Sequence, residues 1–168
     1  TVVINDDGFL PAEVESPIKF LGQYNKNRSP LYFDQIPVPK YWRILSTASQ
    51  GEIYDLDQKR ADIFYHSTDN SRQVKEVRWL DRYGKINWVD HYNCNGYHFA
   101  TTFYENGQPT WRKYYDKHQE VFLTWNLRVG GLFLTEDGRK RYFTSWIEFV
   151  KYYLMSRHFK LDHVFYNT

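Results

Sequence analysis

Histidines are one class of residue in this chain that could act chemically, because imidazole nitrogens bind metals and transfer protons. Two of the six, His91 and His98, fall on neighbouring stretches of expected strand, where their side chains could face each other. Two imidazoles alone make a poor metal site, and no cluster of cysteines or carboxylates accompanies them at ligand spacing. We therefore interpret them as solvated or hydrogen-bonded strand residues, and we expect no metal and no other cofactor.

Three aspartates and one cysteine are the other candidates for chemistry. Asp55, Asp57 and Asp62 lie close together in the sequence, and two carboxylates on one strand face can perform acid–base hydrolysis. Asp55 and Asp57 flank a polar turn, however, and aspartate is common in turns because its side chain caps the backbone. Cys94 falls in an expected hairpin turn without a base to activate it, so we expect an inert thiol. With no phosphate loop, zinc pattern or nucleophile elbow in the sequence, we predict no catalytic residue.

Aromatic residues are the most unusual feature of the composition, at 20% of 168 residues. Aromatic side chains favour strands, and tryptophan and tyrosine also dominate the hot spots of protein interfaces. Two interpretations therefore stay open, namely cross-strand packing and a docking face for a peptide or protein. The candidate protein-binding residues are Trp79, Trp88, Tyr92, Trp111, Tyr114 and Trp125.

Charge and cysteine content exclude several classes of protein. The 22 basic and 20 acidic residues are interleaved, whereas nucleic-acid binders concentrate basic residues on one face. One cysteine excludes a disulfide within the chain and fits a reducing compartment such as the cytoplasm. No apolar run reaches the ~18–20 residues of a membrane span. The chain begins without methionine, in an apolar strand-like run at 1–4, so we expect a domain of a larger protein.

A repeat of turns between 74 and 143 predicts the architecture. Four turns at 81–84, 93–96, 104–107 and 116–119 end at positions spaced by 12, 11 and 12 residues (84→96→107→119). Between them lie strand-like runs at 85–92, 97–104, 108–115 and 120–126. Three turns end in glycine, which adopts the positive φ of tight hairpins, whereas Gln119 in the fourth predicts another geometry. One strand and one turn per unit indicate an up-and-down antiparallel meander.

The segments on either side of the repeat are less regular. Five of the 6 prolines lie before position 43, which predicts short and irregular pairing there. Two strands are expected at 52–56 and 60–65, and Ser145 with Glu148 forms a capping box that predicts a helix over 146–158. Another strand is expected at 161–166. Aromatic and charged residues alternate poorly within the strands, so we expect a sheet partly solvated on both faces.

The predicted fold is therefore mainly β, an extended antiparallel β-meander sheet with one C-terminal helix and short flanking α/β pieces. We expect three parts. They are a proline-rich irregular segment at 1–45 with a first strand from a parent lobe, the sheet at 46–144, and at 145–168 a helix and strand leading back into that lobe.

Several stretches resemble the accessory-secretion glycosylation proteins of Gram-positive bacteria. They are EIYDL at 52–56, KRADIFY at 59–65, VRWLDRYGK at 77–85, VDHYN at 89–93 and FVKYYL at 149–154. The opening NDDGFLP at 5–11 and the stretch at 33–42 resemble the stabilising, chaperone-like subunit of this family. The resemblance covers nearly the whole chain, but its motifs are structural and transfer no catalytic position.

The resemblance implies an extended β-sheet domain of a non-catalytic subunit with a GT-B glycosyltransferase frame. Its expected partners are a catalytic glycosyltransferase subunit and a serine-rich repeat adhesin polypeptide, which the complex modifies with N-acetylglucosamine before export. The expected location is the cytoplasm or the cytoplasmic face of the cell membrane, and self-association is left open.

Two alternatives belong to other classes. One is the acceptor-side domain of a catalytically active GT-B glycosyltransferase, acting on wall teichoic acid or protein. The other is a carbohydrate-binding module, because aromatic platforms also stack on sugars.

Overall fold

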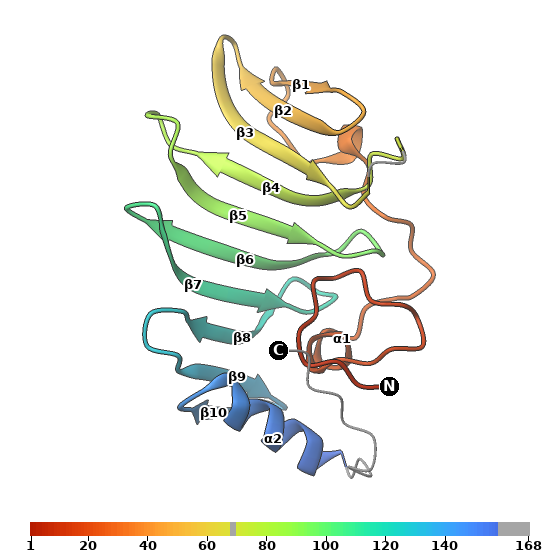
Figure 1. Ribbon diagram of the computed structural model, residues 1–168, viewed down its shortest axis with the longest axis vertical. Coiled ribbons are helices and arrows are strands. Elements are labelled where there is room, and N and C mark those ends of the chain that lie inside the picture. Colours follow the sequence, from red (N-terminus) through yellow and green to blue (C-terminus); the bar gives the residue numbers. More distant parts are fainter. Residues whose placement is uncertain (68–69, 158–168) are drawn as a thin grey trace.

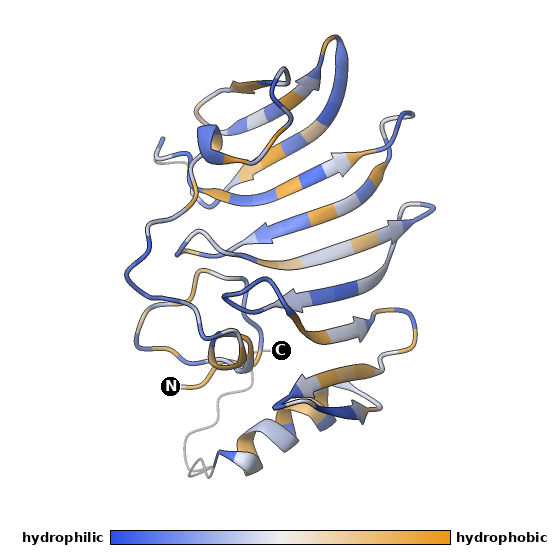
Figure 2. Ribbon diagram, turned by 180° about the vertical axis from the view of Figure 1, so that it is seen from behind, coloured by the Kyte–Doolittle hydropathy of each residue, from blue (hydrophilic) through white to orange (hydrophobic). Residues whose placement is uncertain are grey.

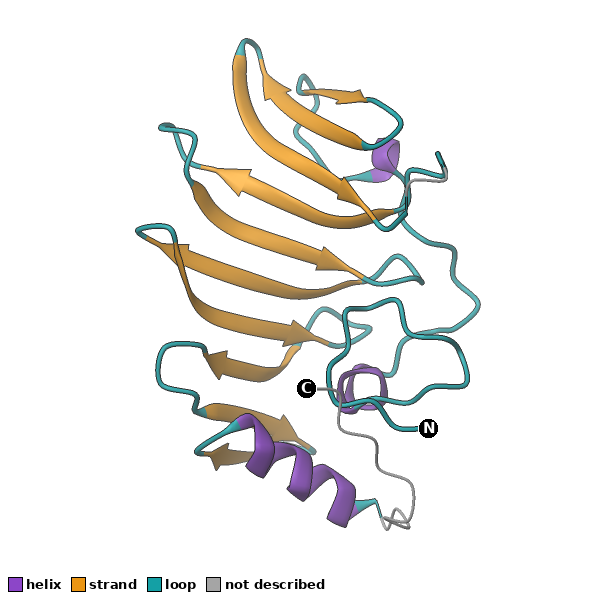
Figure 3. Ribbon diagram, viewed as in Figure 1, coloured by secondary structure: helices purple, strands orange, loops and turns teal. Residues whose placement is uncertain are grey.

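The computed structural model describes residues 1–67 and 70–157, which form one long antiparallel sheet with two α-helices (Figures 1 and 3). Within these residues the sheet has ten strands in chain order, each antiparallel to the next. The strands are β1 (Arg43–Ser46), β2 (Gln50–Asp55), β3 (Gln58–Tyr65), β4 (Val74–Leu80), β5 (Ile86–Tyr92), β6 (His98–Glu105), β7 (Gln108–Tyr115), β8 (Val121–Asn126), β9 (Leu132–Glu136) and β10 (Arg139–Phe143). The predicted mainly β meander is thus confirmed.

Aspartate and asparagine side chains organise the longer turns of the meander. Asp81 Oδ1 accepts hydrogen bonds from the backbone N–H groups of Tyr83 (2.8 Å) and Lys85 (2.9 Å). Asn93 and Asp116 cap their turns in the same way. The last residues of the three turns share a left-handed backbone, with φ of 78° at Gly84, 72° at Gly96 and 65° at Gln119. The prediction of another geometry at Gln119 is therefore wrong, since the same side-chain cap supports a glutamine there.

Each strand from β3 to β8 carries one extra residue near its start, where two residues oppose one on the preceding strand. For example, Phe103 pairs with Trp111 and Tyr104 pairs with Pro109, so Thr110 is extra. The extra residues are Arg60, Lys75, Asn87, Phe99, Thr110 and Phe122. From Asn87 onwards they follow the 12, 11, 12 spacing of the turns. Such bulges bend a strand and increase its twist, which curves the long sheet.

The strand register assigns side chains to two faces, since directly paired residues project to the same side. We call the face that carries Ala100, Tyr114 and Leu123 the helix face, and the face that carries Val77, Trp88 and Trp111 the tryptophan face. Each face carries one buried cluster, at one end of the sheet. The rest of each face is in contact with solvent, as expected from the poor alternation of the strands.

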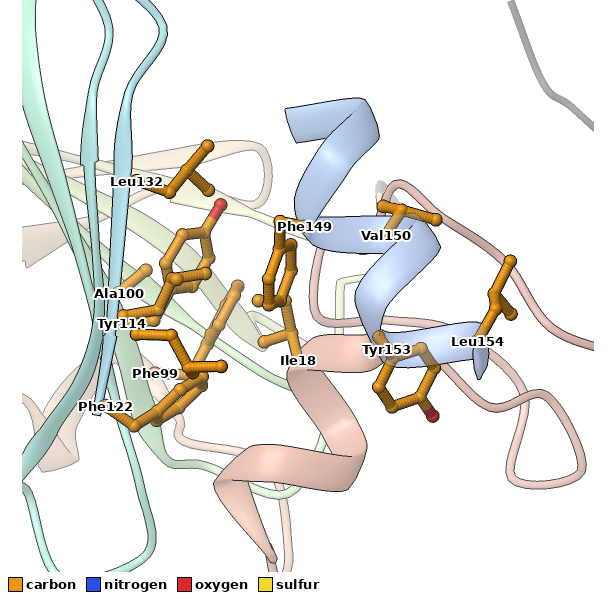
Figure 4. Packing of buried hydrophobic residues seen from close by; sticks show 12 residues of the cluster. Ile18, Phe99, Ala100, Tyr114, Phe122, Leu132, Phe149, Val150, Tyr153 and Leu154 are labelled. Carbon is orange, nitrogen blue, oxygen red and sulfur yellow. The ribbon is translucent and has the colours of Figure 1, made fainter. Parts of the chain in front are cut away.

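The helix face is covered over β6–β9 by α1 (Pro17–Gly22) and α2 (Trp146–Ser156) (Figure 4). Ile18 and Phe149, both almost fully buried, point from the two helices towards the strands. They pack with a cluster that includes Ala100, Tyr114, Leu123, Leu132 and Leu134. Neither helix of the described part of the chain is long and apolar enough to cross a membrane.

The tryptophan face is covered over β2–β4 by residues 31–42, which we call the covering segment. This segment contains a short 3₁₀ helix, η1 (Phe33–Gln35), and lies on the side seen in Figure 2. Its residues Leu31, Ile36, Val38 and Trp42 pack on a second cluster of buried strand residues. That cluster includes Ile53, Ala61, Ile63, Val74 and Val77. The sheet therefore buries opposite faces at its two ends.

The segments on either side of the sheet were predicted in part. In the proline-rich segment, strand pairing is limited to isolated bridges, as expected. The sequence patterns did not predict α1, which forms there because Ser16 caps it, accepting from the Lys19 N–H at 3.0 Å, and Pro17 opens it. Helix α2 starts where its capping box predicts and ends at Ser156. The strand expected at 161–166 lies outside the described residues.

Candidate functional site

Four aromatic residues form a continuous row across the tryptophan face, which we call the aromatic row. Trp79 on β4, Trp88 on β5, Phe103 on β6 and Trp111 on β7 are directly opposite one another in the register. The Trp79 and Trp88 rings stack with centroids 5.9 Å apart, and the Lys113 ammonium lies 5.6 Å from the Phe103 ring centroid. Aromatic cross-strand pairs of this kind stabilise a sheet, so the row has a structural role of its own.

The row emerges from under the covering segment and becomes exposed towards β10. Trp79 lies beside Trp42 of the covering segment, with ring centroids 6.4 Å apart. At the other end, Trp111 is 38% exposed, and further along the same face Phe133 and Tyr142 are 51% and 57% exposed. A shallow groove here is lined by Trp111, Val121, Phe122, Thr124, Phe133, Thr135 and Lys140. Contiguous exposed apolar side chains mark interaction sites in soluble proteins.

A half-buried carboxylate supports the row from the same face. Asp90 accepts hydrogen bonds from Trp79 Nε1 (2.8 Å) and Thr101 Oγ1 (2.9 Å), and its Oδ1 lies 3.1 Å from His98 Nε2. Burial alone would raise the pKa of Asp90, but the hydrogen bonds from His98, Thr101 and Trp79 outweigh it and lower that pKa. Asp90 therefore stays ionised and fixes the orientation of Trp79.

The two candidate histidines lie on opposite faces of the sheet. Arg112 Nε donates to Thr102 Oγ1 (2.8 Å), so the single hydroxyl proton of Thr102 is free to go to His91 Nε2 (2.9 Å). Burial, assisted by the charge of Arg112, lowers the pKa of His91 to about 3, so its ring is neutral. His98 points to the tryptophan face, beside Asp90. They do not face each other, and residues 1–67 and 70–157 contain no group of three or more His, Cys, Asp or Glu placed to bind a metal.

The remaining chemical candidates have structural surroundings. Asp57 lies in the turn between β2 and β3, and Asp62 pairs with the Lys59 ammonium at 2.5 Å, which Glu52 also contacts at 2.8 Å. Burial raises the pKa of the Cys94 thiol, which favours the unreactive protonated form.

The six predicted binding residues separate into two groups. Trp79, Trp88 and Trp111 share the aromatic row. Tyr92 and Tyr114 are buried, at 8% and 4% exposure, and Tyr114 belongs to the core under α2. Trp125 is also on the helix face, where it stacks on Trp146 of α2 with centroids 4.7 Å apart. These last three therefore pack within the domain and do not line the exposed face.

Sequence reasoning missed three aromatic residues of this face, namely Phe103, Phe133 and Tyr142. One signal was present, because Trp88 and Trp111 each follow the last glycine of a turn by four residues, at 84 and 107. Phe103 precedes the 106–107 turn and pairs directly with Trp111. Phe133 and Tyr142 lie on the final hairpin, whose strands the repeat did not delimit.

Comparisons with known proteins agree on one family. The family model of the GtfB middle domain matches residues 42–144, and that of the GtfB N-terminal domain matches residues 1–21. A protein of Limosilactobacillus reuteri subsp. suis, named UDP-N-acetylglucosamine–peptide N-acetylglucosaminyltransferase stabilizing protein GtfB, is 68% identical over 100% of this chain. A Streptococcus agalactiae protein of the same name is 37% identical over 99% of this chain. This chain covers 38% of each.

A solved structure has the same fold. A chain in the crystal structure of a GtfA/B complex bound to UDP and GlcNAc superposes with a TM-score of 0.92 at 35% identity. The match covers 99% of this chain and 38% of that chain. This chain thus spans less than two fifths of the length of the relatives that it matches.

Proposed function

Because this chain belongs to the GtfB family of stabilizing proteins, we propose that it is the sheet domain of a non-catalytic subunit that binds a catalytic N-acetylglucosaminyltransferase. The relatives carry the name of a stabilizing protein, and a similar chain occurs in a GtfA/B complex. The observation that supports this role most directly is the exposed aromatic surface that continues from Trp111, at the end of the aromatic row, to Phe133 and Tyr142. Burying such side chains against a partner releases water from apolar surface, which favours assembly.

The experiment is light-scattering chromatography of the protein, alone and mixed with the catalytic subunit. We expect a stoichiometric complex from the mixture. Trp111→Ser or Phe133→Ser should weaken the complex by about 30-fold or more each, which is the effect of an interface hot spot. The matched control is Leu45→Ser with Leu56→Ser, which removes two exposed apolar residues at the other end of the sheet. Equal loss in the control, or no loss in either, would move the interface away from the aromatic row.

We also propose that the domain binds the acceptor of the glycosylation reaction, a serine-rich repeat adhesin polypeptide. Thr124, Thr135 and Lys140 line the groove beside the exposed aromatic rings. Hydroxyl and ammonium groups can donate to the carbonyl groups of an extended peptide, and the rings can contact its apolar atoms. Titration with an unglycosylated serine-rich peptide, with and without the catalytic subunit, tests whether acceptor and subunit use the same face.

The division of the chain is proposed on the same basis, with a segment at 1–45 and a helical part at 145–168 joining the sheet at 46–144 to a parent lobe. We place the protein in the cytoplasm or at the cytoplasmic face of the membrane, as the family resemblance implies. Limited proteolysis of the protein should release a protected fragment that ends near these boundaries.

Carbohydrate binding is a second candidate function, which the exposed Trp111 ring beside Thr124 and Lys140 favours. It predicts saturable binding of an N-acetylglucosamine oligosaccharide, accompanied by a change in tryptophan fluorescence that Trp111→Ser removes. Assembly remains the first candidate because the exposed aromatic side chains extend from β7 to β10, well beyond one sugar ring.

A further inference from the structure

Strand β10 forms one edge of the sheet and has an unpaired side. Asp137 and Gly138, with φ of 50° and 73°, form the two-residue turn before it, and Glu136 pairs with Arg139 across this turn. The two residues that flank such a turn, Glu136 and Arg139, form a hydrogen-bonded pair, and bonded pairs alternate with non-bonded pairs along an antiparallel ladder. The N–H and C=O groups of Lys140 and Tyr142 therefore point away from β9. Within residues 1–67 and 70–157, no backbone hydrogen bond outside the ladder involves these four groups.

The same edge carries three consecutive exposed cations, Arg139, Lys140 and Arg141. Glu136, which pairs with Arg139 across the turn, is occupied, because it accepts from Arg157 Nη2 at 2.8 Å and from the Tyr152 hydroxyl at 3.1 Å.

Arg139 and Arg141 project to the helix face, where they line a polar groove with Asp137 and Tyr152. The Arg141 guanidinium lies 5.0 Å from the Tyr152 ring centroid. In the described part of the chain, Arg139 and Arg141 form no ion pair. Asp137, in the turn, is the remaining carboxylate beside them.

We infer that β10 is a docking edge for an extended acidic segment of a partner polypeptide, which adds to the sheet as another strand. The free groups of Lys140 and Tyr142 supply main-chain hydrogen bonds, as in other cases of strand addition. Alternate residues of a strand are about 6.8 Å apart, so carboxylates two positions apart in the added strand would face both Arg139 and Arg141. Arg139 and Arg141 lie on the helix face, opposite the aromatic row, while Lys140 and Tyr142 border both surfaces. The inference does not depend on the proposed function.

Charge opposes a second copy of this chain in two of the three two-fold antiparallel registers that pair the outward groups of Lys140 and Tyr142; the third, centred on Tyr142, is decided by the dimer test below. A two-fold antiparallel pairing of β10 with itself, centred on Arg141, places two Arg141 side chains opposite each other. Centred on Lys140, it places Lys140 opposite Lys140 and Arg139 opposite Arg141. Like charges directly opposite one another destabilise a strand pair, and charged edges of one sign prevent self-pairing. An acidic strand reverses the sign of the same contacts.

The test is titration of the protein with the peptide Thr-Glu-Thr-Glu-Val-Glu-Thr, followed through the amide NMR signals of Lys140 and Tyr142. We expect saturable binding that weakens with salt, and no binding of the peptide in which glutamine replaces each glutamate. Arg139→Gln with Arg141→Gln should weaken binding by up to about 25-fold, or about fivefold per cross-strand charge pair. The matched control, Lys40→Gln with Arg82→Gln, removes two exposed charges elsewhere and should leave binding unchanged.

Lys140→Pro separates main-chain pairing from simple charge attraction. It removes an outward N–H group and keeps the ladder to β9, because proline is tolerated where the N–H of an edge strand faces solvent. We expect it to abolish binding while the unfolding temperature stays unchanged; if it unfolds β10, the glutamine variants decide. Equal binding of the glutamine peptide, unchanged binding by Lys140→Pro in a folded protein, or a dimer that Lys140→Pro dissociates would overturn the inference.

Discussion

The sheet leaves one half of each face uncovered, and the two halves differ in how their side chains are satisfied. On the helix face over β2–β4, charged groups pair with one another. Lys59 contacts both Glu52 and Asp62, and Arg78 donates to Glu76 at 3.1 Å and lies 4.0 Å from the Phe64 ring centroid. On the tryptophan face over β7–β10, large aromatic and aliphatic side chains are exposed to solvent.

This difference shows which half favours a partner. Burying paired charges against a partner removes their hydration, which costs free energy. The ion pairs already exist in the free protein and add no new attraction to offset that cost, so a partner would gain little there. Burying apolar surface contributes about 25 cal/mol for each Å² removed from water. The charged half is therefore complete as a solvated surface, whereas the aromatic half would gain free energy from a partner.

The largest expected effect comes from removing the side chain that holds α2 on the helix face. Phe149 of α2 is fully buried between the helix and the sheet, so Phe149→Ala should lower the free energy of unfolding by about 3–5 kcal/mol. Chemical denaturation measures this loss. Met155→Ala, on the exposed side of the same helix, should change it by less than about 0.5 kcal/mol. A small loss for Phe149→Ala would mean that α2 does not stabilise the helix face.

The strands and turns of this fold could be predicted from local chemistry, because each turn carries its own cap. Asp81, Asn93 and Asp116 bond to the backbone within four residues of themselves, so a short window of sequence contains the whole interaction. The same reason explains Gln119. Glutamine lacks the backbone freedom of glycine, but the cap formed by the Asp116 side chain stabilises the left-handed backbone that the turn requires.

The cover of each half could not be predicted, because it comes from segments far away in the sequence. Tyr114 and Trp111 belong to the same strand, yet one is buried and the other exposed. The difference arises from α2, more than thirty residues later, which packs on the face of Tyr114 and leaves that of Trp111 open. The candidate site was therefore predictable by residue type, and its burial required the tertiary structure.

A smaller effect should come from the carboxylate that supports the aromatic row. Asp90→Asn removes the charged acceptor shared by Trp79, Thr101 and His98, so it should lower the free energy of unfolding by about 1–3 kcal/mol at pH 7. Because the pKa of Asp90 is lower in the folded protein, its contribution is present above the unfolded pKa of about 3.9 and is lost as the pH falls through the folded value.

Denaturation at pH 7 and pH 3 measures this dependence. The difference between the protein and Asp90→Asn should shrink at pH 3, where this carboxyl takes up a proton in the unfolded chain. Asp57→Asn, in an exposed turn, is the control and should show no comparable change. A difference that stays constant with pH would mean that the ionised form of Asp90 does not support the row.

The smallest effect should come from the charged half. It tests whether the ion pairs there are exposed and contribute little to stability. Lys59→Met breaks the contacts to Glu52 and Asp62, whose side chains are about one third exposed, so the loss should be below about 1 kcal/mol. Hydrogen bonds with Asp62 and Glu52 raise the pKa of Lys59, so the amine is charged throughout the neutral range. Salt screens such pairs, and denaturation in 0.05 M and 1 M salt should show the difference between variant and parent shrinking. A loss of several kcal/mol that salt does not reduce would show that these charges act as a buried network, and the contrast between the two halves would fail.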